Sequence, residues 1–134
     1  MELRTQKVKL HRGLLLGDVP QVDAVVREST ANDVMESVRA AERVVPTPDG
    51  GYALMASDSE VGVEMVCRQV ASIGDINGPI SRNQLKLLSG ADLTLLQSVA
   101  NALDQASLEV ALSHRGRDQE AGQKSGNASP ATGQ

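Results

Sequence analysis

Met65-Val-Cys-Arg-Gln-Val-Ala-Ser-Ile-Gly74 and Asp75-Ile-Asn-Gly-Pro-Ile-Ser81 open the stretch that decides the fold of this chain, which continues to Leu103. Apolar residues recur here at the spacing of amphipathic helices, every third or fourth position. Glycine and proline residues between positions 74 and 79 interrupt that spacing. We therefore predict two helical segments joined by a short hinge, and we expect most of the hydrophobic core to lie in or beside them.

The composition indicates one small domain with an aliphatic core. The chain has 134 residues and a mass of 14.1 kDa, which is enough for a single domain with a modest core. It contains no Trp, no Phe and one tyrosine, Tyr52, so aliphatic side chains must fill that core. The formal net charge of −4 and the lack of aromatic stacking residues argue against a nucleic-acid partner.

Cysteine usage and hydropathy indicate a cytosolic protein. The single cysteine, Cys67, excludes an internal disulfide and a cysteine-based zinc site. Because Cys67 lies in an apolar helical run, we expect a small buried hydrophobe rather than a reactive thiol. The N-terminal residues lack the apolar core of a secretory signal, and no run approaches the roughly 20 apolar residues of a membrane helix. We therefore expect no membrane partner.

Residues 7–28 are predicted to form a β-hairpin. Val8, Leu10 and Leu14 alternate with polar residues, which is the two-residue period of a half-buried strand. Gly17-Asp18 suits a two-residue hairpin turn, and a valine-rich run follows it. The register set by this turn pairs Leu16 with Val19, Leu10 with Val25, Arg12 with Asp23 and Lys7 with Glu28.

Three helices are predicted between the hairpin and residue 88, each from a capping residue followed by an apolar run. The capping residues are Thr30 with Asp33, Asp58 or Ser59, and Ser81 with Gln84. The stripes are Val34, Val38, Ala41 and Val45 in the first helix and Val63, Val66, Cys67, Val70 and Ile73 in the second. Residues 52–56 form a short apolar piece whose structure the pattern leaves open.

The longest helix is predicted from about residue 90 to residue 114, with Ser89 and Asp92 as its capping pair. Its main stripe consists of Leu96, Val99, Leu103, Ala106 and Val110. Leu95, Ala102 and Leu112 lie off that stripe, which is typical of a helix that is central or part of an interface.

Residues 115–134 contain no Val, Leu, Ile, Met or aromatic residue. A segment of this composition cannot bury enough apolar surface to offset the entropy of ordering it. The chain is thus predicted to be a single α+β domain over 1–114, with an N-terminal β-hairpin followed by about four α-helices, and a disordered C-terminal tail over 115–134.

Residues that carry catalysis or bind metals are few and poorly placed. His11 and His114 lie far apart in sequence, and neither has a partner at metal-ligand spacing. We expect His114 to lie at the C-terminal end of its helix. Glu60 and Glu64 are one helical turn apart, which would suit acid–base work, but a solvated acidic face is the better interpretation. We therefore expect no enzyme activity, no metal and no cofactor.

Three short sequence motifs occur in order between residue 7 and about residue 112. They are Arg27-Glu-Ser-Thr30, Arg68-Gln-Val-Ala71 and Leu88-Ser-Gly-Ala-Asp-Leu93. Their order and spacing resemble the tail assembly chaperones of Mu-like phages. The resemblance implies a non-enzymatic assembly factor that is made during infection and acts in the host cytoplasm. It implies the tape measure protein and the tail tube protein as partners, and a frameshifted, extended form of the chain as a further one.

We expect the partner-binding residues to be apolar residues that lie outside the main apolar stripes of the helices. These are Leu95, Ala102 and Leu112, with Met65 and Met55 as softer contacts. The same five residues would also suit ordinary core or a self-association face, so a homo-oligomer stays open. Two other functions stay open as well, a structural minor tail component of the virion and a small DNA-binding regulator. The acidic helix after residue 90 disfavours the regulator.

Overall fold

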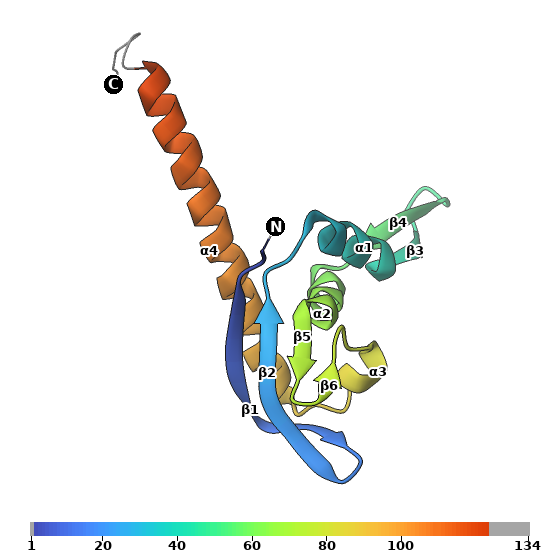
Figure 1. The fold of residues 1–134 in the computed structure, drawn as a ribbon. Coiled ribbons are helices and arrows are strands. Elements are labelled where there is room, and N and C mark those ends of the chain that lie inside the picture. Colours follow the sequence, from blue (N-terminus) through green and yellow to red (C-terminus); the bar gives the residue numbers. More distant parts are fainter. Residues whose placement is uncertain (1, 124–134) are drawn as a thin grey trace. The chain divides into compact units, whose positions relative to one another are not determined.

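The computed structural model describes residues 2–123, with side-chain burial up to residue 116, and divides the chain into two compact units, Met1–Leu103 and Asp104–Gln134. The first unit combines a four-stranded sheet, a two-stranded ribbon and helices, which confirms the predicted α+β class (Figure 1). The elements are β1 (Thr5–Leu16), β2 (Val19–Arg27), α1 (Ala31–Ala41), β3 (Glu42–Pro46), β4 (Tyr52–Ala56), α2 (Asp58–Gln69), β5 (Val70–Ile73), β6 (Ile76–Asn77), α3 (Arg82–Leu85) and α4 (Gly90–Gln123).

The main sheet has the spatial order β1-β2-β5-β6, and each neighbouring pair is antiparallel. The predicted helix end at residues 70–73 and the hinge after it are therefore wrong, because this stretch forms the β5–β6 hairpin. Val70 and Ile73 pair with Val26 and Ala24 of β2, where they extend the apolar face of the sheet. Gly74 turns the chain with φ 58°, a conformation that glycine adopts without steric cost.

The β1–β2 hairpin is confirmed, but most of its predicted register is wrong. Leu16 pairs with Val19 as expected, whereas beyond an irregularity between Lys9 and Leu14 the pairs are shifted, with Lys9 opposite Asp23. The predicted pairs Leu10–Val25, Arg12–Asp23 and Lys7–Glu28 do not form. Gly13 has φ 72° inside this bulge, and a Cβ there would collide with the carbonyl oxygen of Gln21. A bulge held by such a glycine resets the register of the whole hairpin.

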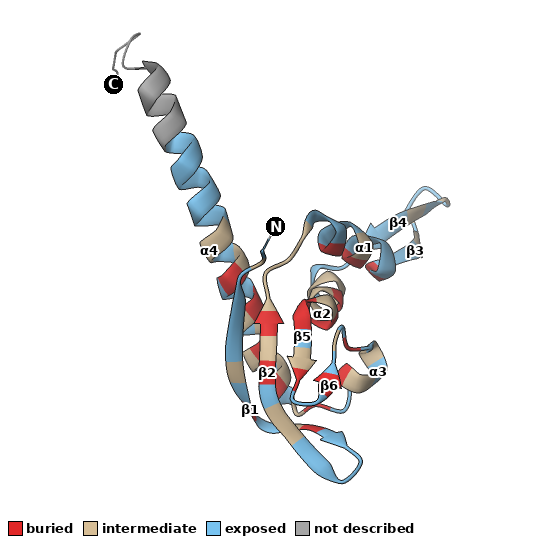
Figure 2. Ribbon diagram, in the orientation of Figure 1, coloured by how far each residue is buried: buried red, intermediate tan, exposed pale blue. Residues whose placement is uncertain are grey.

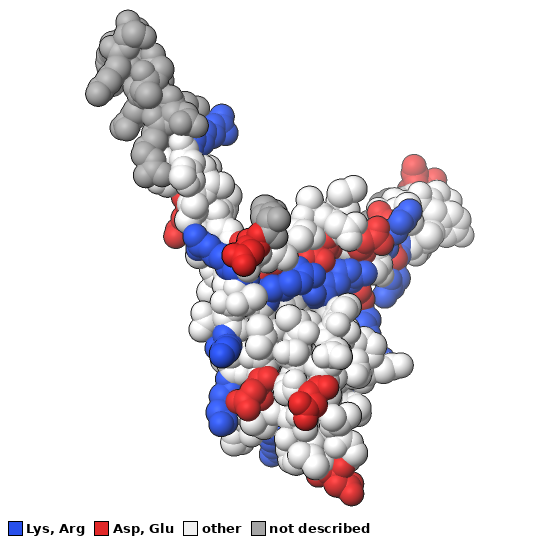
Figure 3. Space-filling view, in the orientation of Figure 1, with Lys and Arg blue, Asp and Glu red and all other residues white. Residues whose placement is uncertain are grey.

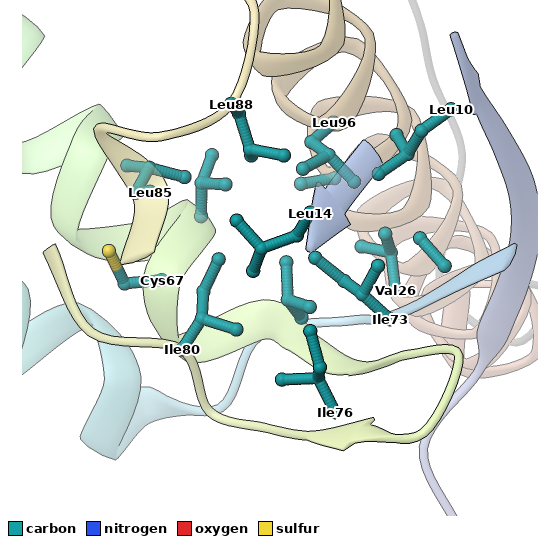
Figure 4. Packing of buried hydrophobic residues seen from close by; sticks show 14 of the residues in the cluster. Leu10, Leu14, Val26, Cys67, Ile73, Ile76, Ile80, Leu85, Leu88 and Leu96 are labelled. Atoms are coloured by element: carbon teal, nitrogen blue, oxygen red, sulfur yellow. The ribbon is translucent and has the colours of Figure 1, made fainter. Parts of the chain in front are cut away.

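The core lies between the sheet, α2, α3 and the first half of α4. Figure 4 shows Leu14 of β1, Ile73 of β5 and Leu96 of α4 pointing into one cluster. The burial of Leu10, Leu14 and Cys67 agrees with the sequence-based expectation. The full cluster is aliphatic apart from the cysteine and consists of Leu10, Leu14, Ala24, Val26, Val66, Cys67, Val70, Ile73, Ile76, Ile80, Leu85, Leu88, Leu96, Ala100 and Leu103.

α1 starts with the predicted capping box of Thr30 and Asp33 but ends earlier than expected. It stops at Ala41, and the following residues Glu42–Pro46 form β3, which pairs with β4. The predicted continuation of α1 to Val45 is therefore wrong, because valines 44 and 45 pair across the ribbon with residues 54 and 53. The N-cap of α2 is Ser57, not Asp58 or Ser59, while the capping box of Ser81 and Gln84 opens α3 as predicted.

α4 begins as predicted, with the backbone N–H of Asp92 donating to Ser89 Oγ at 3.1 Å. It continues to Gln123, beyond the predicted end at residue 114. The expectation that His114 lies at the C-terminal end of its helix is therefore wrong, because His114 lies within α4. Of the predicted disordered tail, residues 124–134 lie outside the described part of the chain, and the domain division at residue 114 remains a prediction.

Candidate partner-binding surface

α1 packs against the rest of the first unit through its polar edge. Asp33, Ser37 and Ala41, spaced four residues apart, are its buried side chains, while Val34 and Val38 are exposed and Met35 is 69% exposed (Figure 2). The predicted stripe of Val34, Val38, Ala41 and Val45 is therefore wrong for the two valines of α1. An amphipathic helix normally buries its apolar side, so the arrangement here leaves that side available for a partner.

The orientation of α1 is held by a two-pronged ion pair between Arg27 at the end of β2 and Asp33. Arg27 Nη1 donates to Asp33 Oδ2 at 2.7 Å and Nη2 donates to Oδ1 at 3.1 Å. Arg27 Nη2 also donates to the backbone carbonyl of Arg68 at 2.8 Å, which links β2 to the end of α2. Burial alone would raise the pKa of Asp33, but the hydrogen bonds from Arg27 and Thr30 outweigh it and lower that pKa. Asp33 is therefore a charged anchor for the helix.

The β3–β4 ribbon carries a second exposed apolar face. Residues that lie opposite each other in an antiparallel pair point to the same face, so Val44 with Leu54 and Pro46 with Tyr52 share one side. Val44, Tyr52 and Leu54 are all strongly exposed. On the opposite face Met55 is exposed too, whereas Val45 and Ala53 are half-buried. A two-stranded ribbon with an uncovered apolar face is marginal in water by itself.

α1 lies against both β4 and α2. We call the exposed apolar residues of α1 and of both faces of the ribbon the α1–ribbon surface, which consists of Val34, Met35, Val38, Val44, Tyr52, Leu54 and Met55. Exposed apolar residues that form a contiguous patch often mark a protein-interaction site. Of the seven, only Met55 was predicted from the sequence to contact a partner. The alternation of Val44 with Pro46 and of Tyr52 with Leu54 was the signal that would have found the ribbon.

The other predicted contact residues lie in separate places. Leu95 packs against the core cluster, and Met65 on α2 is half-buried. Ala102 and Leu112 are exposed on α4, Ala102 in the first unit and Leu112 in the second. The structure therefore does not gather the five predicted residues into one site, and their contact with a partner stays a prediction.

Glu60 and Glu64 belong to an ion-pair cluster and not to a solvated acidic face. Glu64 is buried, with Oε1 accepting from Arg68 Nη1 at 2.7 Å and Oε2 from Arg82 Nη1 at 3.0 Å. Arg82 Nη1 also donates to Glu60 Oε1 at 3.0 Å. Burial would raise the pKa of Glu64, but the hydrogen bonds from the two arginines lower it. A carboxylate kept ionised in this way joins α3 to α2 and makes a poor general acid.

Asp92 closes the bulge of β1. Its Oδ1 accepts the backbone N–H of His11 at 2.6 Å, and its Oδ2 accepts those of Arg12 and Gly13, each at 2.9 Å. The side chain is 1% exposed. Burial would raise the pKa of Asp92, but the three backbone hydrogen bonds lower it. This capping residue of α4 therefore also fixes the shape of a strand about eighty positions earlier in the chain.

Chemical sites other than a protein-binding surface have little support in the described residues. Within residues 2–123, no group of three or more His, Cys, Asp or Glu side chains is placed to hold a metal ion. None of the helices in that range is long and apolar enough to cross a membrane. On the face shown in Figure 3, basic and acidic residues lie close together across the middle and do not form one basic patch.

The sequence of this chain is similar to those of a known protein family. A family model described as tail assembly protein gp41 matches residues 10–117. The Mu-like prophage FluMu protein gp41 of Haemophilus influenzae is 40% identical over 120 residues, covering 90% of this chain and 94% of that protein. The probable tail assembly protein gp41 of Escherichia phage Mu is 35% identical over 120 residues, 87% of this chain and 83% of that protein.

A longer relative also matches. The probable tail assembly protein FS-gp41 of Escherichia phage Mu is 34% identical over 119 residues, which cover 86% of this chain and 63% of that protein. No solved structure matches the chain.

Proposed function

Because the chain belongs to the tail assembly protein gp41 family of Mu-like phages, we propose that it acts as a tail assembly chaperone. In this role it binds the tape measure protein, the tail tube protein or both before the tail is complete. The action is non-enzymatic and takes place in the host cytoplasm. A family that serves tail assembly needs protein contacts, and the described residues offer an apolar surface for them.

The observation that carries the proposal is the orientation of α1. Arg27 and Asp33 fix the helix by its polar edge, so Val34, Met35 and Val38 face away from the core. A chaperone for an apolar client needs aliphatic side chains that stay in water until the client arrives. Methionine suits such a surface because its side chain is flexible and adapts to different partners. Met35 and Met55 both contribute to the α1–ribbon surface.

An extended form of the chain is a further proposed partner. The match to FS-gp41 covers 63% of that protein, so a longer relative of this domain exists in phage Mu. If the extended form shares the α1–ribbon surface, it would bind the same clients through the same residues.

The proposal is tested by co-expression with the tape measure protein encoded by the same phage. We expect the chain to raise the soluble fraction of the tape measure protein and to co-purify with it. The double variant Val38→Asp/Leu54→Asp should lose co-purification, because it places charge on both parts of the α1–ribbon surface. Leu87→Asp is the matched control, because Leu87 is 75% exposed between α3 and α4, outside that surface.

Two results would contradict the proposal. One is an unchanged solubility of the tape measure protein together with no complex, with the tail tube protein giving the same result. The other is recovery of the chain at fixed stoichiometry from purified phage particles, which would make it a structural tail component. Folding of each variant is checked by circular dichroism before binding is measured.

A further inference from the structure

The second unit carries an apolar helix face that is separate from the α1–ribbon surface. Over residues 104–116 of α4, Leu108 and Leu112 lie one turn apart and are 50% and 55% exposed. Ala111 lies on the same side and is exposed, so the backbone at the middle of this face is accessible. A single solvated helix of this length is marginal in water unless its apolar side is covered.

An acidic and a basic residue flank this apolar face at nearly equal distances from its centre. Asp104 precedes the two leucines and Arg115 follows them, at a separation of three helical turns, which puts all four side chains on one side of the helix. Asp104 and Arg115 are nearly equidistant from residue 110, as are Leu108 and Leu112. From one end to the other, this face therefore carries an acidic residue, a leucine, a small residue, a second leucine and a basic residue.

We propose that this face of α4 binds the same face of a second copy of the chain in antiparallel orientation. Leu108 of each copy then packs against Leu112 of the other, and Asp104 of each lies opposite Arg115 of the other. Such an interface is isologous, with one patch serving both copies. Ala111 at its centre allows the close approach that packed helices need, with axes about 8–10 Å apart.

The charges at the two ends of the face favour an antiparallel second copy of the chain as the partner. In the antiparallel pair each end of the face joins an acid to a base, and the apolar centre is buried by its own copy. In a parallel pair Asp104 would face Asp104 and Arg115 would face Arg115, which repels at both ends. Asp104 also has a polar contact within its own chain, and a carboxylate has enough acceptor sites for a second donor.

The inference does not depend on the proposed chaperone function. The α1–ribbon surface lies in the first unit, and the helix face lies in the second. A chain that self-associates but binds neither the tape measure protein nor the tail tube protein would contradict the chaperone proposal and leave this one standing. A chain that binds one of these proteins but stays monomeric would contradict the dimer proposal and leave the chaperone proposal standing.

Sedimentation equilibrium of the full chain, alone, tests the proposal between about 5 μM and about 500 μM. We expect a monomer–dimer equilibrium in this range. Leu108→Glu should weaken dimerisation at least tenfold, a change of about 1.4 kcal/mol. Leu87→Glu should leave it unchanged, because Leu87 is also exposed, at 75% against 50% for Leu108, but lies in the first unit. Circular dichroism establishes that each variant keeps its helix content.

Charge exchange tests the antiparallel orientation. Asp104→Arg and Arg115→Asp should each weaken dimerisation, because each places like charges at both ends of the face. An equimolar mixture of these two variants should form a heterodimer, since every end then joins an acid to a base. A purely structural role of either residue would give no rescue on mixing.

Three results would overturn the inference. They are a monomer at every concentration, a dimer that Leu108→Glu leaves intact, and single charge variants that fail to associate when mixed. Raising the salt concentration should weaken the wild-type dimer and the mixed dimer alike, since exposed ion pairs are screened by salt.

Discussion

α1 and the first half of α4 are both amphipathic helices with a capping Ser or Thr, and each is held by a buried carboxylate, yet only α4 buries its apolar side. In the first half of α4 the buried apolar residues are Leu96, Ala100 and Leu103, the side that helical spacing predicts, and the carboxylate of Asp92 is buried in its first turn. In α1 they are the polar-edge residues Asp33 and Ser37 together with Ala41. The difference shows that an apolar stripe indicates where a helix can be covered, while a buried ion pair can decide where it is attached.

The physical reason lies in Arg27. Its guanidinium carries more donors than any other side chain and is never deprotonated in proteins. The end of β2 places it, partly buried, beside α2 and the first turn of α1, where a carboxylate partner offsets the cost of withdrawing its charge from water. Asp33 supplies that carboxylate, and the apolar side of α1 is turned to solvent as a consequence.

Breaking the attachment of α4 at Asp92 should have the largest effect on stability. Asp92→Ala leaves the backbone N–H groups of His11, Arg12 and Gly13 without their acceptor. We expect the free energy of unfolding to fall by about 3–5 kcal/mol, since these are charge-assisted bonds to a buried carboxylate. Urea unfolding followed by circular dichroism measures the loss.

Acid should reproduce part of this loss in the wild type. The pKa of Asp92 is lowered in the folded state, so its contribution is fully present above its unfolded-state pKa of about 3.9 and disappears as the pH falls through the folded-state pKa. The stability of Asp92→Ala should therefore depend less on pH below about 4 than that of the wild type. Equal slopes for both proteins would contradict the assignment of these hydrogen bonds to Asp92.

Breaking the attachment of α1 should cost less. Asp33→Ala leaves Arg27 without its carboxylate, and we expect a loss of about 2–3 kcal/mol, because Arg27 is partly exposed and retains its bond to the Arg68 carbonyl. Hydrogen exchange should quicken in α1 before it quickens in β2. As the control, Val38→Ala should change stability by no more than about 0.5 kcal/mol, because Val38 is exposed. A large effect of Val38→Ala would show that the apolar side of α1 is covered.

The smallest expected effect has the opposite sign. Ser37 Oγ is buried and, among the described residues, has no hydrogen-bond partner. Ser37→Ala removes this unsatisfied hydroxyl and adds helix propensity, so we expect the protein to gain about 1 kcal/mol. Ser98→Ala on the exposed side of α4 is the control for propensity alone, with a gain of about 0.5 kcal/mol. A loss of stability in Ser37→Ala would show that the hydroxyl is satisfied after all.

Part of the molecule was predictable because the signals are local. The hairpin turn at Gly17-Asp18, the capping boxes of α1 and α3 and the Ser89–Asp92 cap depend on residues within four positions of one another. Of the predicted α4 stripe, Leu96, Val99 and Leu103 pack in or against the core, because helical spacing and burial agree there, whereas Val110 at its end is exposed. The likeness to the tail assembly proteins of Mu-like phages was readable from the order and spacing of short sequence motifs.

The rest depended on contacts between distant residues. Nothing local reveals that Asp92 captures the bulge at His11–Gly13, so the hairpin register could not be read from the turn alone. Likewise, Val70 and Ile73 continue the spacing of α2, and only their pairing with β2 makes them a strand.

The sequence by itself determined the fold class, the aliphatic core, the principal caps and the family. Only the tertiary structure decided the register of the hairpin, the β5–β6 strands, the early end of α1 and the side that α1 presents to solvent. The reason is the same in each case. Turns, caps and stripes act over a few residues, whereas a buried carboxylate such as Asp33 or Asp92 is positioned by donors that folding alone brings to it.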